Sequence, residues 1–120
     1  MNKIPPSELA VMKVIWSSSE PLSSRQVIDI LEEKKGWKRT TILTLLSRLA
    51  ERKFLSTEKI KRYTYYTALV DKEDYIKLET KVFFDKIHEN SLKSLVTALH
   101  ENHDISAEDI SDLKEWIKDK

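Results

Sequence analysis

Threonines and cations are grouped in one short stretch, 36-GWKRTTILTLLSRLAERKFL-55. A threonine hydroxyl both donates and accepts hydrogen bonds, and its methyl group packs against the methyl group of thymine. Lysine and arginine side chains bind phosphate oxygens, which positions a protein on a duplex. These types together predict a DNA-reading surface, with base contacts from Thr40, Thr41, Leu43 and Thr44 and phosphate contacts from Lys38, Arg39 and Arg48.

A helix over about residues 39–52 is expected to carry this group. Apolar residues recur at i, i+3, i+4 and i+7, which predicts one buried face, and they are Ile42, Leu45, Leu46 and Leu49. On a helical wheel Thr40 and Thr44 lie opposite this face, with Thr41 and Arg48 on one flank and Leu43 on the other. The second helix of a helix-turn-helix presents such residues to the major groove.

Two helices are predicted before this one. The first covers about residues 7–17, with Ser7 as its N-cap. The second begins with the capping box of Ser23 and Gln26 and ends at Gly36, the expected left-handed residue. The capping box accounts for Ser23 and Gln26, although the start of this helix could also present its amides to a phosphate.

A β-hairpin is predicted after the three helices. Residues 54–59 and 63–68 are rich in β-branched and aromatic types, and residues 60–62 separate them. The hairpin supplies three more candidate phosphate contacts, Lys59, Lys61 and Arg62. Three helices followed by a basic hairpin predict a mainly α fold whose residues 1–70 form a winged helix-turn-helix domain.

Several residues have two readings. Tyr63, Tyr65 and Tyr66 could stack on unpaired bases, but strand aromatics more often pack in the core. His100 and His103 have a spacing that could share a metal, although histidine near a helix end often complements the helix dipole. We predict no metal site and no cofactor, and we find no nucleophile and base that would indicate an enzyme.

Residues 71–120 are predicted to form a helical dimerisation region of two helices. The first runs from about residue 71 to residue 100, and the second follows a capping pattern of Ser106 and Asp109. Two helices alone cannot bury their apolar side chains, so we expect a second copy to cover them. The expected dimerisation residues are Tyr75, Leu78, Val82, Ile87, Leu92, Leu95, Val96, Leu99, Ile110, Leu113, Trp116 and Ile117.

Charge divides the chain in the same way. Residues 1–70 contain 13 Lys or Arg and 7 Asp or Glu, a net charge of +6, whereas residues 71–120 have a net charge of −5. A basic first half predicts an anionic partner. The chain has no cysteine, which excludes disulfides and thiolate metal sites, and no apolar run long enough to span a bilayer. We therefore expect a cytoplasmic protein with no membrane insertion.

Nearly the whole chain resembles the penicillinase repressor family, to which BlaI and MecI belong. The resemblance rests on four segments: 8-ELAVMKVIW-16, 37-WKRTTILTLLSRLAERKFL-55, 65-YYTAL-69 and 94-SLVTAL-99 with the acidic ISAEDISDLK that follows. It implies a homodimeric transcriptional repressor that binds palindromic promoter DNA, including that of β-lactam resistance genes. Thr41 and Thr44 occupy the family's base-contacting positions.

The resemblance also implies a route of induction. In members that control β-lactam resistance, a membrane sensor-protease pathway leads to cleavage of the repressor within its dimerisation helix. An ungapped alignment places that bond at Ala98-Leu99. This chain departs from the family at residues 38–40 and at Leu43, which implies a different operator. An alternative to DNA binding is a winged-helix adaptor that binds only proteins.

Overall fold

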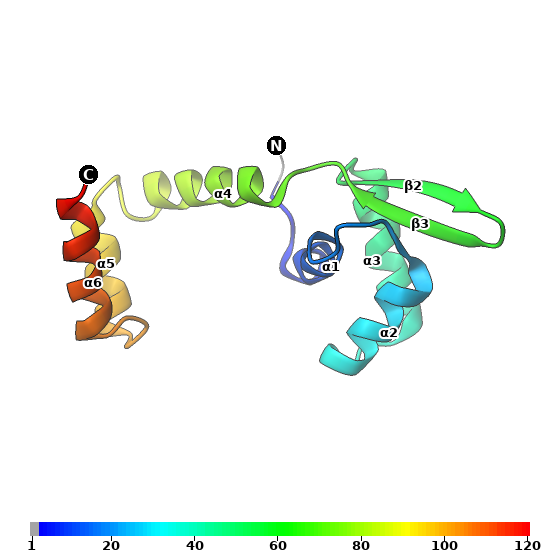
Figure 1. Ribbon diagram of the computed structural model, residues 1–120, viewed down its shortest axis with the longest axis horizontal. Helices are drawn as coiled ribbons and strands as arrows, with labels where there is room; N and C mark the ends of the chain where they lie inside the picture. The colour runs from blue at the N-terminus through cyan, green and yellow to red at the C-terminus, as the bar shows by residue number, and fades with distance from the viewer. Residues whose placement is uncertain (1–2) are drawn as a thin grey trace. The chain divides into compact units, whose positions relative to one another are not determined.

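The computed structural model describes residues 3–120, and the chain divides after Ile76 into two compact units. The first unit contains three helices and three strands (Figure 1), which are α1 (Pro6–Trp16), β1 (Leu22–Ser23), α2 (Ser24–Lys35), α3 (Arg39–Glu51), β2 (Leu55–Ile60) and β3 (Tyr63–Ala68). Helix α4 (Lys72–Lys86) begins in this unit. The second unit continues α4 and adds α5 (Leu92–Glu101) and α6 (Ala107–Lys118).

Helix α1 begins one residue earlier than predicted. Its N-cap is Pro5, whose side chain makes no capping hydrogen bond, so the assignment of Ser7 as the cap is wrong. Pro6 is the first helical residue, where a missing N–H leaves no hydrogen bond unmade and the fixed φ of proline suits the helix. The carbonyl of Pro5 accepts the first helical hydrogen bond, from the Leu9 amide at 2.8 Å.

Both predicted ends of α2 are confirmed. The Ser23 hydroxyl accepts from the Gln26 amide at 3.2 Å, and the Gln26 side chain accepts from the Ser23 amide at 2.8 Å. Gly36 ends the helix with a left-handed φ of 68°. This turn leads into α3, so it sets where the helix with the threonines begins.

The hairpin is confirmed, with its ladder running from Leu55↔Ala68 to Ile60↔Tyr63. The loop is therefore only Lys61 and Arg62, one residue shorter than expected, and Lys61 has a positive φ of 58°. Strand β1 was not predicted, and it pairs with β3 to make the strand order β1-β3-β2. A strand of two residues is too short to show a periodic pattern.

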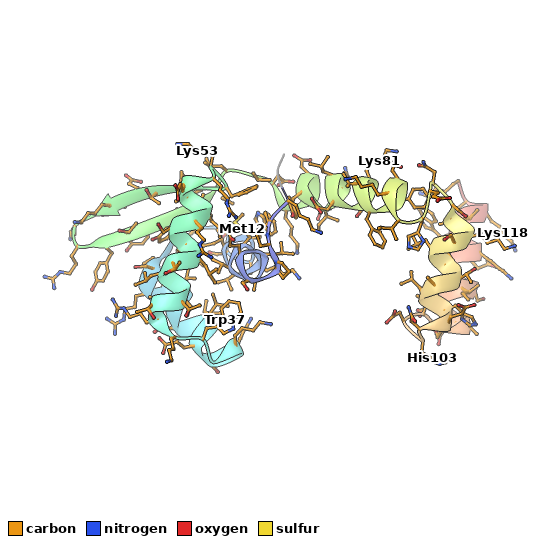
Figure 2. All side chains as sticks on the ribbon, turned by 180° about the vertical axis from the view of Figure 1, so that it is seen from behind. Met12, Trp37, Lys53, Lys81, His103 and Lys118 are labelled. Atoms are coloured by element: carbon orange, nitrogen blue, oxygen red, sulfur yellow. The ribbon has the colours of Figure 1, made fainter. Side chains whose placement is uncertain are left out.

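The core of the first unit joins all three helices to the sheet. The four apolar residues of α3 are at most 5% exposed, and Met12 of α1 is completely buried (Figure 2). Tyr66 is also buried, and its burial raises the pKa of the phenol. The expectation that at least one wing tyrosine packs in the core is confirmed. The result is the predicted winged helix-turn-helix.

The prediction of one helix from residue 71 to residue 100 is wrong, because α4 ends at Lys86 and α5 begins only at Leu92. Glu89 and Asn90 both have positive φ, 50° and 63°, and Ser91 then caps α5 by accepting from the Ser94 amide. This serine cap was not predicted, because the apolar residues recur at helical spacing on both sides of it. The second half therefore has three helices instead of two. The capping box of α6 is present, and its hydrogen bonds lower the pKa of Asp109.

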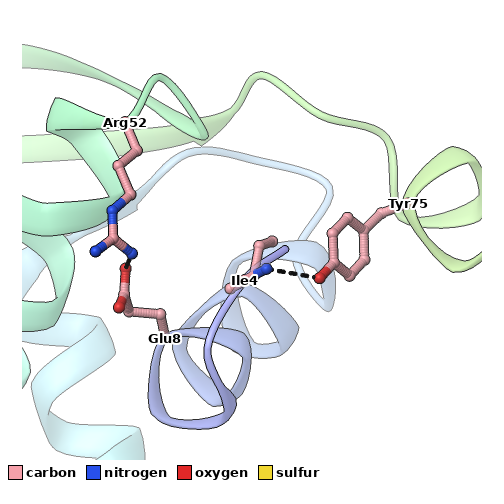
Figure 3. Close-up of polar contacts among 4 residues, drawn as sticks. All are labelled: Ile4, Glu8, Arg52 and Tyr75. Atoms are coloured by element: carbon pink, nitrogen blue, oxygen red, sulfur yellow. Dashed lines mark hydrogen bonds and ion pairs between the residues drawn. The ribbon is translucent and has the colours of Figure 1, made fainter. Parts of the chain in front are cut away.

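Tyr75 is corrected from the dimerisation set to the core of the first unit. Its side chain is buried, and its hydroxyl accepts a hydrogen bond of 2.8 Å from the Ile4 amide (Figure 3). The ring lies 5.9 Å from that of Trp16, whose indole N–H donates to the Val70 carbonyl at 2.9 Å. A side chain held in this way has no free surface for a second copy.

None of the helices formed by residues 3–120 has the length and apolar character needed to cross a membrane.

Replacing Gly36 by alanine tests how strongly the turn into α3 depends on backbone conformation. No atom lies within 4 Å of an added Cβ, so the cost arises only from the left-handed φ. We expect Gly36→Ala to lower the free energy of unfolding by roughly 1–2 kcal/mol in urea titrations. Asparagine tolerates this conformation better, so Gly36→Asn should lower it less. Equal losses for the two variants would contradict this explanation.

Candidate nucleic-acid interface

The exposed face of α3 gathers most of the predicted base-reading residues. The packing of its apolar face turns Thr40, Thr41 and Thr44 outward, and all three are exposed. Together with Leu45 and Arg48 they line a shallow surface depression of about 280 Å³. Side chains that are one helical turn apart thus form one continuous polar surface.

The hydroxyls of Thr41 and Thr44 differ in the hydrogen bonds that they can form with base edges. The Thr44 hydroxyl donates to the carbonyl of Thr40 at 2.9 Å, so it retains only acceptor capacity. An acceptor fits the amino groups of adenine or cytosine in the major groove. The Thr41 hydroxyl has no partner among the described residues, so it can either donate or accept. The two threonines therefore offer different hydrogen-bonding patterns.

Leu43 lies outside this depression. It is half-buried and packs against the core of the first unit. Only part of its side chain is exposed for contact with a thymine methyl group. The structure therefore brings together three of the four predicted base-reading residues and places the fourth at the margin of the core.

The six predicted phosphate-binding cations are all exposed. Lys38 is the N-cap of α3, Arg39 is its first residue and Arg48 lies in its last turn. Lys59 is in β2, and Lys61 and Arg62 form the loop of the wing. Across residues 3–120, none of the six forms an ion pair or a side-chain hydrogen bond. Cations without an internal partner are free to neutralise phosphates and release counterions.

The wing projects away from the helices of the first unit (Figure 1). Lys59 shares a face of β2 with Leu55, because alternate residues of a strand point to the same side. Leu55 is 2% exposed and belongs to the core, so this is the face turned toward the helices at the base of the wing. The opposite face has exposed apolar groups at its tip, where Ile60 pairs with Tyr63.

Two features of the first unit were not identified from the sequence. Arg25, in the first turn of α2, is exposed and has no ion-pair partner in the described part of the chain. Arg52, which ends α3, donates to the carboxylate of Glu8 in α1 at 2.7 Å (Figure 3). A pair separated by 44 residues leaves no local signal in the sequence. Arg25, by contrast, could have been identified, because it lies two residues after the capping Ser23, at the start of a predicted helix.

The histidines of the second half lie in α5 and in the segments that flank it. Residues 3–120 contain no group of three or more His, Cys, Asp or Glu side chains placed to hold a metal ion. His100 lies in the last turn of α5, and His103 follows the helix with a positive φ of 63°. His88 forms a hydrogen bond of 2.9 Å with the Ser94 hydroxyl.

Substitution of Thr44 and Lys61 separates base reading from phosphate binding. We expect Thr44→Ala to reduce the preference for operator over random DNA by roughly 1–3 kcal/mol, because a base contact is lost. Lys61→Ala should weaken binding to both DNAs equally and reduce the salt slope by about one unit, because one phosphate contact is lost. Fluorescence anisotropy titrations at several salt concentrations measure both effects. An unchanged preference in Thr44→Ala would show that Thr44 reads no base.

Comparison with known proteins identifies the family. Residues 4–119 match the sequence model of the penicillinase repressor family. The chain is 34% identical over 122 residues to a penicillinase repressor of Bacillus licheniformis, with 99% of this chain and 94% of that protein covered. It is 29% identical to the methicillin resistance regulatory protein MecI of Staphylococcus aureus, with 98% and 95% covered.

Two solved structures resemble the first unit. The solution structure of the DNA-binding domain of the repressor BlaI superposes with a TM-score of 0.56 and 38% identity, covering 62% of this chain and 94% of that one. The Bacillus licheniformis BlaI monomeric form in complex with the blaP half-operator gives a TM-score of 0.54 and 38% identity, covering 62% and 89%. The match over residues 4–119 is decisive: the chain belongs to the penicillinase repressor family.

Proposed function

We propose that this chain, a DNA-binding transcriptional repressor, binds palindromic promoter operators as a homodimer with one winged domain on each half-site. The observation that carries the proposal is the exposed surface of α3, where Thr40, Thr41 and Thr44 lie beside cations that have no ion-pair partner within residues 3–120. Hydroxyls on the outer face of a helix can reach base edges, while the cations bind the phosphates on either side.

The proposed docking places α3 in the major groove and the wing beside it. Arg39 and Arg48 lie near opposite ends of α3, so they can contact phosphates on the two sides of the groove. The loop cations of the wing, Lys61 and Arg62, reach the neighbouring backbone or minor groove. The complex of BlaI with the blaP half-operator supports this placement, because its protein has the fold of the first unit.

The second unit supports the proposed dimer because it has no core of its own. No side chain between residues 77 and 120 is buried, although all three helices carry apolar residues. Exposed fractions reach 54% at Leu92, 57% at Trp116 and 64% at Ile87. Burial of one large apolar side chain contributes roughly 1.5–3 kcal/mol, so a second copy that covers these faces stabilises the unit substantially.

The proposed dimer surface consists of the predicted apolar residues without Tyr75. Each of them is at least partly exposed in the single chain, and they are Leu78, Val82, Ile87, Leu92, Leu95, Val96, Leu99, Ile110, Leu113, Trp116 and Ile117. A two-fold symmetric dimer presents two copies of α3, which matches the symmetry of a palindromic operator.

We also propose that the regulated genes include β-lactam resistance or related genes and that a membrane sensor-protease pathway relieves repression. The names of the two relatives, a penicillinase repressor and a methicillin resistance regulatory protein, support the gene class. The aligned cleavage bond, Ala98-Leu99, lies inside α5, where the Ala98 carbonyl accepts from the Asn102 amide at 3.1 Å. Proteases act on locally opened backbone, so cleavage here requires α5 to unfold first.

Mapping of the chromosomal sites bound by the protein tests the DNA-binding half of the proposal. We expect a palindromic motif with half-sites about 34–36 Å apart or a multiple of that distance, upstream of the repressed genes. Binding to a fragment with this motif should weaken steeply with salt, because several phosphates are neutralised. Binding that is insensitive to salt and sequence would instead favour a winged-helix adaptor for proteins.

Substitutions in α6 test the dimer. We expect Trp116→Gln with Ile117→Gln to shift the chain from dimer to monomer in analytical ultracentrifugation at micromolar concentration, because two exposed apolar side chains lose their cover. The matched control, Lys114→Gln with Lys118→Gln, adds the same two glutamines to α6 at exposed charged positions and should remain dimeric. A wild-type chain that sediments as a monomer would refute the dimer outright.

A further inference from the structure

The ion pair of Glu8 and Arg52 joins the first turn of α1 to the C-cap residue of α3. Arg52 Nη1 donates to Glu8 Oε1 at 2.7 Å, and the two residues are 44 positions apart in the sequence (Figure 3). The Glu8 side chain is only 4% exposed, whereas that of Arg52 is 44% exposed. In the first unit this is the one ion pair formed by residues that the structure describes.

Apolar packing alone leaves α3 free to make small movements. The face of α3 that packs in the core consists of four aliphatic side chains. Burial of such groups depends on area and has no preferred direction. Close packing of these side chains resists large shifts, but a rotation of a few degrees about the helix axis changes the buried area little and moves the outward hydroxyls of Thr41 and Thr44. A binding constellation must be held to within about 0.5 Å, so this freedom would weaken base reading.

The ion pair constrains the orientation of α3, which apolar packing constrains only weakly. A charge-assisted hydrogen bond fixes both distance and angle between its two groups. The Arg52 backbone is itself fixed to α3, because its amide donates to the Arg48 carbonyl at 3.0 Å. The Phe54 amide then closes the helix by donating to the Leu49 carbonyl at 2.9 Å. The position of Arg52 relative to Glu8 is therefore transmitted to the whole helix.

Stability alone is a poor reason for this contact. A buried carboxylate must lose its hydration, and an apolar pair of similar volume often stabilises a fold at least as well as an ion pair. In some proteins, however, a buried charged group specifies one arrangement of the elements that it joins, which is its best supported use. Here the elements are α1 and the helix that carries the base-reading threonines.

We propose that Glu8 and Arg52 are positioning residues that set the rotation and register of α3, so that they determine sequence discrimination without contacting DNA. The proposal rests on the proposed function, since discrimination requires an operator. Arg52 lies one turn beyond Arg48 on α3 and could be mistaken for another phosphate contact. Its guanidinium is instead held by Glu8, unlike those of Arg39 and Arg48, which have no ion-pair partner among the described residues.

The test compares affinities of the full chain for an operator fragment and for random DNA of equal length, measured by fluorescence anisotropy. We expect Glu8→Gln and Arg52→Gln each to reduce the ratio of the two affinities about tenfold, which is within the range for one mismatched base pair. Random-DNA affinity and its salt slope should stay unchanged, because the phosphate-binding cations are intact. The double variant should lose no more than either single variant, since all three remove the same charge-assisted hydrogen bond.

A matched control removes an ion pair elsewhere. Glu115 and Lys118 form an exposed pair in α6 at 3.4 Å, so Glu115→Gln makes the same chemical change away from α3 and should keep the wild-type ratio. All variants are compared at a temperature at which circular dichroism shows them folded. If Glu8→Gln fails to fold, Arg52→Gln alone gives the result, because its side chain is partly exposed.

Two results would overturn the proposal. If Arg52→Gln weakens binding to both DNAs equally and reduces the salt slope by about one unit, Arg52 is a phosphate contact. If folded variants keep the wild-type ratio, the ion pair serves only stability. A wild-type chain that shows no discrimination would refute the proposed function itself, and this is a different outcome from either of these.

Discussion

Burial of the aliphatic face of α3 is the interaction on which the rest of this structure depends. Ile42, Leu45, Leu46 and Leu49 join α1, α2 and the base of the wing into one core. The apolar residues and the threonines of α3 lie on opposite faces, so burial of the apolar face turns the threonines outward. The same burial that stabilises the fold therefore creates the surface that we propose contacts DNA. Directional contacts, such as the Glu8–Arg52 ion pair, act on a helix that the core already holds.

The two units differ in how much apolar surface they bury within the single chain. The first buries residues from all its helices and strands and ties the start of α4 to Ile4 through the hydroxyl of Tyr75. The second has three helices but no buried side chain between residues 77 and 120. In the proposed dimer, this unit gains much of its stability from association. Folding and dimer formation of the repressor are therefore linked in the proposed function.

Charge follows the same division. The six cations around α3 and the wing have no ion-pair partner in the part of the chain that the structure describes. The described ion pairs of the second unit, by contrast, lie on exposed helix faces and contribute little to stability. Cations left unpaired on one surface raise the energy of the free protein slightly and lower that of the complex with a polyanion. This difference favours binding.

The sequence by itself determined the three helices and the β-hairpin of the winged domain, the apolar and polar faces of α3, the caps at Ser23 and Ser106, and the left-handed residue Gly36. Each of these depends on residues that are close together in the sequence. It also indicated the family, through the residues around Trp37 to Leu55. Only the tertiary structure decided the pairing of β1 with β3, the contact of Glu8 with Arg52 and the burial of Tyr75, since these join residues far apart in the chain. The break before Ser91 was missed for the opposite reason: its signal is local, but the apolar pattern continues across it.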